Sequence, residues 1–227
     1  AKAQDTVNAM ETVGGQAQRE ILKGNHVVAA NADSYDMDWG INSGIQVQNG
    51  NILVSQPNSS HTTTTPVFFV DESGKANIDP LRSVADIQVG EDYKAEVQYI
   101  NRNQYCTGND TRVFTYYLTR DHVMSYGAGG VSDQQAYALI RLNDFDGYIH
   151  AGTQYTGEVV QTYTESGFAI PSDCIVYAGY GTKAQEVAGL AVGEAVTYSC
   201  NLYTGTYAEA DGVYTDRGTL CNEVYTA

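Results

Sequence analysis

The sequence contains few basic residues, and this shortage excludes one class of partner. Lys and Arg together number 12, against 27 Asp and Glu, which gives a formal net charge of −15 at pH 7. A field of that sign repels nucleic-acid phosphates and anionic membrane surfaces. The chain also lacks an apolar run of the roughly 18 residues that a bilayer-spanning helix needs. We therefore expect no nucleic-acid partner and no membrane insertion.

Cysteine is also scarce. The four residues Cys106, Cys174, Cys200 and Cys221 include no C-x-x-C pair, which argues against a zinc ribbon or a redox dithiol. A Cys200–Cys221 disulfide is one interpretation if the compartment is oxidising, and four buried free thiols are the other. The G-x-S-x-G nucleophile elbow and the P-loop pattern are absent too. We expect no metal and no cofactor.

What is present predicts a folded chain. Hydrophobic residues make up 42% and charged residues 17%, too apolar a balance for a disordered acidic tail. Tyrosine occurs 18 times, which favours strands and amphipathic contact surfaces of the kind that face sugars. No composition break divides the chain, so we expect a single domain over residues 1–227. The start at Ala1, without methionine or an apolar signal segment, suggests a mature or excised piece of a longer product.

Periodicity predicts an α+β fold: a mixed, mostly antiparallel sheet, an N-terminal amphipathic helix and one further short helix. The first helix is expected from Gln4 to Lys23, ending at Gly24, supported by a sheet and followed by a buried strand at His26–Ala30. Asn49-Gly50, between alternating apolar residues, predicts a hairpin with a type I′ turn. The other expected elements are a hairpin joining Val67–Val70 to Ala76–Ile78, strands at Val84–Val89, Ala95–Ile100, Val113–Leu118, Ala136–Leu142, Gly157–Tyr163 and Ala195–Leu202, and a helix at Thr182–Leu190 capped by Thr182 and followed by a turn at Gly193.

The segment Asn31–Gly40 is the main candidate for chemistry, because loops that leave a buried strand often carry sites. It contains Asp33, Asp36 and Asp38, and crowded carboxylates can leave one protonated beside an ionised partner. An Asx-rich loop that caps its own backbone is an alternative. Calcium binding is a third, although the spacing lacks the alternating ligands and glycine of an EF-hand loop.

Seven segments, in this order, together resemble the phosphodiester glycosidase family. They are Val27–Tyr35, Ser43–Gly50, Phe68–Ala76, Ile100-Asn101-Arg102, Gly157–Val160, Ala169–Asp173 and Gly189–Glu194. Members of that family continue into a second half with an Arg-Thr strand, an Asp-Gly-Arg turn and an Asp-Gly-Gly-Gly-Ser loop, none of which occurs before Ala227. The resemblance therefore implies the N-terminal part of such a domain, inactive by itself, with half of its site supplied by sequence that follows.

The resemblance also implies roles for individual residues. Asp33 and Asp36 would stabilise an oxocarbenium-like centre or activate water, and Arg102 would bind phosphate oxygens. An arginine that pairs with surface carboxylates is the alternative for Arg102. The remaining substrate-binding candidates are Asn31, Tyr35, Ser43, Gly44 and Asn101.

Two functions are expected from these features. The first is part of a secreted or cell-surface hydrolase that cleaves a glycosyl phosphodiester in a surface polysaccharide or glycoconjugate, with a carbohydrate or glycosyl phosphate as its partner. The alternative is a non-catalytic carbohydrate-binding or adhesive module of a surface protein.

Overall fold

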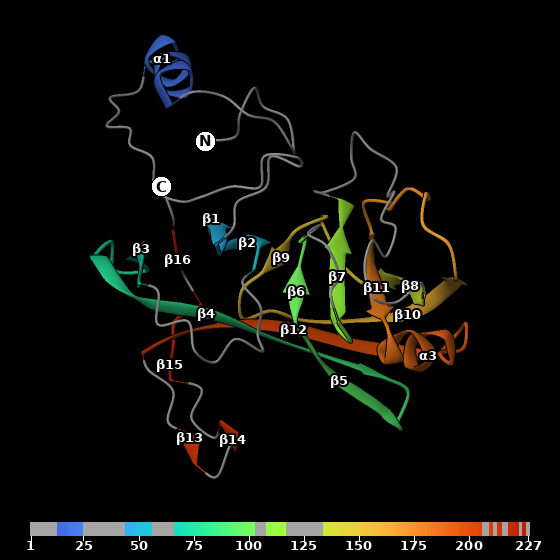
Figure 1. Cartoon of the computed structure of the whole chain (residues 1–227). Coiled ribbons are helices and arrows are strands. Elements are labelled where there is room, and N and C mark those ends of the chain that lie inside the picture. Colours follow the sequence, from blue (N-terminus) through green and yellow to red (C-terminus); the bar gives the residue numbers. More distant parts are fainter. Residues whose placement is uncertain are drawn as a thin grey trace.

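The computed structural model describes residues 13–24, 44–55, 66–102, 108–116, 134–205, 209–210, 213–214, 218–222 and 224–225. These residues form mainly strands in a mixed, curled sheet, with helices at two places, so the class is α+β-like (Figure 1). In chain order the elements are α1 (Val13–Leu22), β1 (Gln46–Gln48), β2 (Asn51–Val54), β3 (Pro66–Asp71), β4 (Ala76–Val89), β5 (Tyr93–Val97), β6 (Tyr99–Ile100), β7 (Thr111–Thr115), β8 (Gln135–Leu142), β9 (Ile149–His150), β10 (Gln154–Tyr163), β11 (Cys174–Tyr180), α3 (Thr182–Ala188), β12 (Ala195–Thr204), β13 (Glu209–Ala210), β14 (Val213–Tyr214), β15 (Thr219–Leu220) and β16 (Val224–Tyr225).

Helix α1 corresponds to the predicted N-terminal helix, and its end is confirmed. Gly24 follows the helix with φ 87°, the left-handed conformation that favours glycine there. The expected support by a sheet is wrong for the last turn, because Ile21 and Leu22 are 58% and 80% exposed. The predicted start at Gln4 and the strand at His26–Ala30 lie outside the described residues.

The predicted hairpin around Asn49-Gly50 is confirmed as β1 and β2. Asn49 and Gly50 have φ of 53° and 75°, the two positive values that a type I′ turn requires. Val47 and Ile52 pair across the hairpin and are buried in the main core. Strand β9 pairs with the other edge of β2, which gives a small three-stranded sheet.

The second predicted hairpin, β3 with β4, is also confirmed, and β4 is longer than expected. It does not stop after Ile78 but continues to Val89, so two predicted strands are one. Pro80 is accommodated because it lies opposite Pro66, the first residue of β3, where a missing backbone N–H is tolerated.

The turn of this second hairpin is organised by the carboxylate of Asp71. Its Oδ1 accepts hydrogen bonds from the Ser73 hydroxyl at 2.6 Å, the Ser73 backbone N–H at 3.0 Å and the Lys75 backbone N–H at 3.1 Å. Its Oδ2 accepts one from the Asn77 amide at 3.0 Å. These donors, led by the Ser73 hydroxyl, lower the pKa of Asp71 to about 2.

A pH titration followed by NMR tests this turn. A depressed folded-state pKa adds stability that is present above the unfolded value of 3.8 and is lost as the pH falls through about 2. We expect the Asp71 carboxyl signal to titrate near pH 2, and the Ser73→Ala variant to titrate closer to 3.8 because it loses the largest stabilising hydrogen bond. A wild-type midpoint at the unfolded value would show that the turn does not hold the carboxylate in solution.

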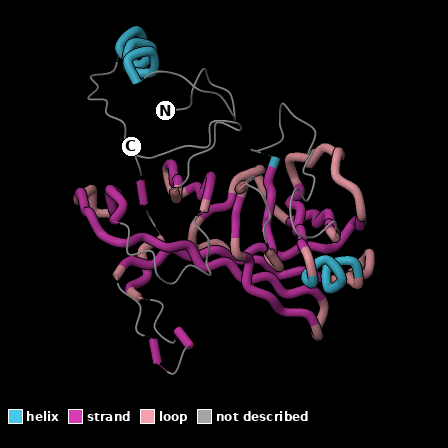
Figure 2. Tube along the Cα trace, viewed as in Figure 1, coloured by secondary structure: helices cyan, strands magenta, loops and turns pink. Residues whose placement is uncertain are grey.

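The main sheet curls until it closes on itself. Its strands follow the order β4, β12, β10, β8, β11, β7 and β6, with β5 on the other edge of β4. Figure 2 shows the strands of this sheet as long, curved paths. The strand predicted at Ala95–Ile100 is divided at Gln98 into the end of β5 and β6. This single stretch of chain therefore pairs with β4 at one end and with β7 at the other. The β6–β7 pair is parallel and the other pairs are antiparallel, as a mixed and mostly antiparallel sheet requires.

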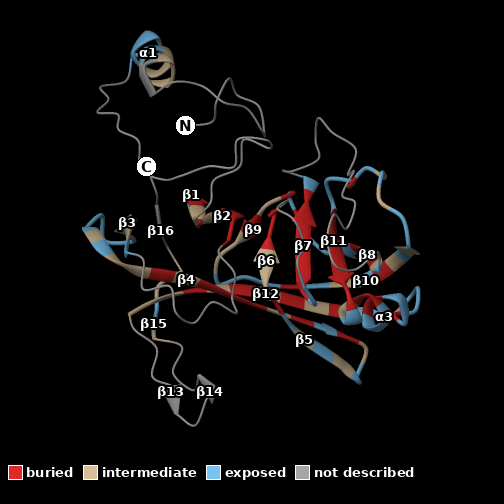
Figure 3. Ribbon diagram, viewed as in Figure 1, coloured by how far each residue is buried: buried red, intermediate tan, exposed pale blue. Residues whose placement is uncertain are grey.

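Strand β11 lies in the middle of the sheet and was not among the predicted elements. All seven of its residues are buried, as are all five residues of the neighbouring strand β7 (Figure 3). Ile175 and Tyr177 face the main core, while Val176 and Ala178 face a second cluster that includes Phe168. A strand that is buried on both faces has no apolar–polar alternation, which is why periodicity did not detect it.

Helix α3 packs against β8 and β11 and places Ala184 and Val187 in the main core. The predicted cap is wrong: Gly181, with φ 61°, occupies the N-cap, and no side chain of the helix caps it. Instead, the backbone N–H of Thr182 donates to Oδ1 of Asn109 at 2.7 Å. This partner comes from a loop that is distant in sequence, so local capping rules could not identify it. The turn predicted at Gly193 is confirmed by its φ of 90°.

The Cys200–Cys221 disulfide is absent from the structure, where Cys174, Cys200 and Cys221 are free thiols. Burial raises the pKa of Cys174 to about 12, so this thiol stays protonated at neutral pH. Cys106 lies outside the described residues. Within the described part of the chain, no helix is long and apolar enough to cross a membrane.

Candidate functional site

Asn101 joins the end of β6 to the first hairpin. It is buried and has φ 52°, a left-handed conformation that asparagine tolerates better than most residues. Its amide donates to the Leu53 carbonyl at 2.8 Å and to the Thr115 hydroxyl at 3.0 Å, and its Oδ1 accepts from the Thr115 backbone N–H at 2.8 Å. One side chain thereby connects β2, β6 and β7.

A second connection lies one residue earlier. The backbone N–H of Ile100 donates to the Ser55 hydroxyl at 2.9 Å, and the Ser55 N–H donates to the Ile100 carbonyl at 3.1 Å. Both residues are buried. The strand end that carries Asn101 and Arg102 is therefore fixed against the hairpin that follows the acidic segment in sequence.

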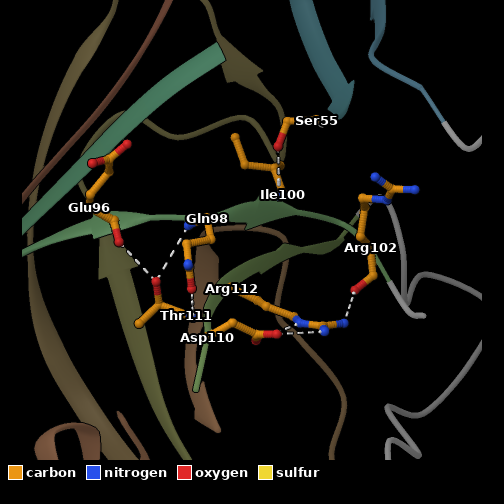
Figure 4. A network of polar contacts seen from close by, with 8 residues as sticks. All are labelled: Ser55, Glu96, Gln98, Ile100, Arg102, Asp110, Thr111 and Arg112. Atoms are coloured by element: carbon orange, nitrogen blue, oxygen red, sulfur yellow. Dashed lines mark hydrogen bonds and ion pairs between the residues drawn. The ribbon is translucent and has the colours of Figure 1, made fainter. Parts of the chain in front are cut away.

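The side chain of Arg112, on β7, forms a buried ion pair beside Arg102. Its Nε and Nη2 donate to the two carboxylate oxygens of Asp110, each at 3.0 Å, and its Nη1 donates to the Arg102 carbonyl at 2.8 Å. The two side chains of the pair are only 4% and 11% exposed. Figure 4 shows that the Arg102 carbonyl faces Arg112, whereas the Arg102 side chain extends away from it.

Two tyrosine rings complete this group. The Arg112 guanidinium carbon lies 4.8 Å from the ring centroid of Tyr99 and 5.1 Å from that of Tyr180, and that of Arg102 lies 5.9 Å from Tyr99. Such distances favour cation–π attraction. We call Tyr99, Arg102, Asp110, Arg112 and Tyr180 the arginine cluster. With two guanidinium groups and one carboxylate, it carries net positive charge in a chain of net charge −15.

The backbone beneath the arginine cluster is held by Thr111. Its hydroxyl donates to the Glu96 carbonyl at 2.8 Å, and its N–H donates to the Gln98 side-chain oxygen at 3.0 Å (Figure 4). Its own carbonyl accepts from the Gln98 N–H at 3.1 Å. These bonds join β7 to the place where β5 bends into β6, so hydrogen bonds between strands hold the backbone that carries the cluster.

Of the residues predicted for the site, three lie in the described structure. Asn101 and Arg102 are adjacent and buried, with Arg102 6% exposed rather than on an open surface. Gly44 is partly buried two residues before β1. The other predicted residues lie outside the described part of the chain: Asn31, Asp33, Tyr35, Asp36 and Ser43.

Sequence reasoning missed the partners of Arg102. The charged pair Asp110 and Arg112 is separated by one residue, a spacing that places both side chains on one face of an extended chain. That signal is weak, because the same spacing occurs at exposed strand edges. The described residues contain no group of three or more His, Cys, Asp or Glu placed to hold a metal ion.

Comparison with known proteins gives the fold and no family. No protein-family model and no curated protein matches the chain. One similar solved structure is named "Putative exported protein" from Burkholderia pseudomallei, with a TM-score of 0.58 and 14% identity over 97% of this chain. Another is a hypothetical protein from Synechocystis, with a TM-score of 0.52 and 15% identity over 82% of this chain. The chain spans 44% and 33% of the lengths of these two proteins.

Proposed function

We propose that this chain is the N-terminal part of a secreted or cell-surface hydrolase that cleaves a glycosyl phosphodiester. The supporting observation is that Asn101 and Arg102 end a strand bonded to the hairpin of residues 46–54, beside a positively charged cluster. Two of the segments that resemble the phosphodiester glycosidase family, Ser43–Gly50 and Ile100-Asn101-Arg102, contribute to this hairpin and this strand end. Positive charge at this place in an acidic chain suits an anionic phosphodiester.

The reaction breaks the bond between the sugar C1 and the phosphate oxygen. The leaving phosphomonoester takes the electron pair of that bond, water adds its oxygen to C1, and the released proton passes to a carboxylate. Because a phosphomonoester anion leaves readily, stabilising its charge contributes more than protonating it. We assign the carboxylate role to Asp33 and Asp36, with Asn31 and Tyr35 contacting the sugar.

Arg102 is the proposed phosphate ligand rather than Arg112. Three nitrogens of Arg112 already donate to Asp110 and to the Arg102 carbonyl, so this guanidinium serves to position the strand end. The Arg102 side chain extends to the other side (Figure 4). A guanidinium can donate to two phosphate oxygens at once, which fixes the orientation of the substrate.

The remaining part of the site is proposed to come from polypeptide that follows Ala227 in the parent protein. The two structural neighbours are more than twice as long as the part that matches this chain. The word "exported" in the name of one of them supports placing the hydrolase outside the cytoplasm. The 227-residue chain by itself is expected to be inactive.

The tyrosine content gives little support to the alternative of a carbohydrate-binding module. Five of the described tyrosines are buried, and among those with described side chains only Tyr116, at 38%, counts as exposed. Tyr137, Tyr155, Tyr177, Tyr180 and Tyr198 are the buried ones. Their rings fill the core rather than form a platform for sugars.

Substitution of Arg102 in the parent protein tests the proposed function. Release of phosphomonoester from a panel of synthetic sugar-1-phosphodiesters is measured for the wild type and for Arg102→Gln. We expect kcat/KM to fall about 100-fold or more, the usual loss when one charge-stabilising donor is removed. Arg102→Lys retains the charge without the two-pronged geometry and should keep an intermediate rate.

The matched control is Arg141→Gln. Arg141 is 54% exposed and pairs with Glu158 and Asp173 at 3.7 and 3.3 Å on the surface of the sheet, so its loss should leave the rate unchanged. Thermal unfolding of each variant separates lost activity from lost folding. No phosphomonoester release by the wild-type parent, or an Arg102→Gln variant that folds and turns over normally, would contradict the proposal.

A further inference from the structure

Tyr99, on strand β6, lies beside both guanidinium groups of the arginine cluster. The guanidinium carbon of Arg112 is 4.8 Å from the centroid of its ring, and that of Arg102 is 5.9 Å away. Both distances lie within the range of about 6 Å in which a cation is attracted to the face of an aromatic ring. One ring therefore interacts with the proposed phosphate ligand and with the arginine that holds the backbone of that ligand.

The position of the Arg102 side chain depends on a turn of the backbone at Asn101. In a regular strand, residues three apart point to opposite faces, so Arg102 would share the face of Ile100 rather than that of Tyr99. Ile100 is fully buried in the main core. Asn101 has φ 52°, which departs from the extended conformation, and the Arg102 guanidinium lies near the Tyr99 ring instead. The left-handed residue therefore turns Arg102 away from the face of Ile100 and toward this ring.

Two contacts then restrain the backbone and the side chain of Arg102 separately. Nη1 of Arg112 donates to the Arg102 carbonyl at 2.8 Å, and Arg112 is itself held by Asp110. That bond restrains the Arg102 backbone, but a long side chain keeps several rotatable bonds beyond it. The Arg102 side chain extends away from Arg112 (Figure 4). The contact with Tyr99 acts on the guanidinium, the part of Arg102 that would meet a ligand.

An aromatic ring holds a guanidinium without cancelling its charge. A carboxylate neutralises an arginine and competes with an incoming anion, whereas a ring face leaves the positive charge and the N–H donors in the guanidinium plane. Arg102 is only 6% exposed, and a cation–π contact contributes more when the cation is desolvated. Tyr99 therefore suits a guanidinium whose charge is used to bind an oxyanion.

We propose that Tyr99 is a positioning residue whose ring holds the Arg102 guanidinium in the orientation that binds phosphate oxygens. Asn101 contributes by turning Arg102 toward that ring. This inference rests on the role proposed above for Arg102 as the phosphate ligand, and it concerns binding of the anion rather than hydrolysis. It can therefore be tested on the 227-residue chain.

The experiment is an NMR titration of that chain with inorganic phosphate at constant ionic strength, following the Nε–H signal of Arg102. The signal is assigned by its loss in Arg102→Gln. We expect Tyr99→Leu to weaken phosphate binding about 10-fold, within the range that a desolvated cation–π contact contributes, and to remove the ring-current shift of the Arg102 signal. Tyr99→Phe keeps the ring and should bind within about 2-fold of the wild type.

The matched control is Tyr203→Leu, which should change neither the affinity nor the Arg102 signal. Tyr203 is also a partly buried tyrosine of a strand, but it lies on β12, opposite Arg82 and Leu220. A measurement on the wild type avoids dependence on the folding of any variant: nuclear Overhauser effects between the Tyr99 ring and the Arg102 side chain are expected.

Three results would overturn this inference. They are wild-type spectra without Tyr99–Arg102 Overhauser effects, a phosphate titration that leaves the Arg102 signal unmoved, and equal affinities of the wild type and Tyr99→Leu. A loss in Tyr99→Phe as large as that in Tyr99→Leu would also contradict it, because the ring would then not be the cause. A parent protein that releases no phosphomonoester, beside the expected titrations, would contradict the proposed hydrolase and leave the role of Tyr99 intact.

Discussion

Replacing Asp110 with alanine is expected to lower the free energy of unfolding by about 3 to 5 kcal/mol, the usual cost of leaving one partner of a buried ion pair alone. The carboxylate accepts two hydrogen bonds of 3.0 Å from Arg112, whose side chain is only 4% exposed. Without the Asp110 carboxylate, the Arg112 guanidinium remains buried beside the rings of Tyr99 and Tyr180 and loses this charged partner. Urea denaturation monitored by circular dichroism measures the change.

The comparison variant is Asp173→Ala. Asp173 pairs with Arg141 at 3.3 Å, but both side chains are more than half exposed, so the expected cost is below about 1 kcal/mol. The two variants remove the same chemical group and differ in burial. Similar losses for Asp110→Ala and Asp173→Ala would mean that the Asp110–Arg112 pair is not buried in solution.

Asn101→Ala is expected to destabilise the chain by a similar amount, about 3 to 5 kcal/mol. Alanine would leave the buried Leu53 carbonyl and Thr115 N–H without the hydrogen bonds they make with the Asn101 side chain, at about 1 to 3 kcal/mol each. It would also occupy a position with φ 52°, where alanine is strained. The measurement is again the urea midpoint, with an unchanged m-value as evidence that the unfolding transition is the same.

Two further variants separate these causes. Asn101→Gly removes the side chain and tolerates the positive φ, so it should be less destabilising than Asn101→Ala by about 1 kcal/mol. Asn143→Ala is the control, because the Asn143 amide donates only to Thr156 at an exposed position. A small cost for Asn101→Ala, comparable with that of the control, would show that Asn101 does not join the hairpin to β7.

Local sequence signals predicted those parts of the fold that have one buried face. Asn49-Gly50 identified the first hairpin because only a few residue types adopt two successive positive φ values. Alternation identified β10 and β12, whose buried and less buried residues alternate along much of each strand. Alternation did not detect β11, because the two clusters of the core cover its two faces. It also did not predict that β4 continues through Pro80, because the position of Pro80 opposite Pro66 depends on tertiary pairing.

The candidate site was predictable only in part. Asn101 and Arg102 were identified from a family resemblance, and the structure places them at the end of β6 against the first hairpin. The contribution of Asp110 and Arg112 could not be predicted, because it depends on the parallel pairing of β6 with β7. Long-range pairing of this kind leaves no periodic signal in either strand.

The central claim is that Arg102 and the acidic segment act on one substrate. The most direct measurement is a crystal structure of the parent protein with a non-hydrolysable sugar-1-phosphonate. We predict phosphonate oxygens within hydrogen-bond distance of the Arg102 guanidinium, and the anomeric carbon beside the carboxylate of Asp33 or Asp36. A phosphonate bound away from Arg102, with those carboxylates on another face of the protein, would contradict the account.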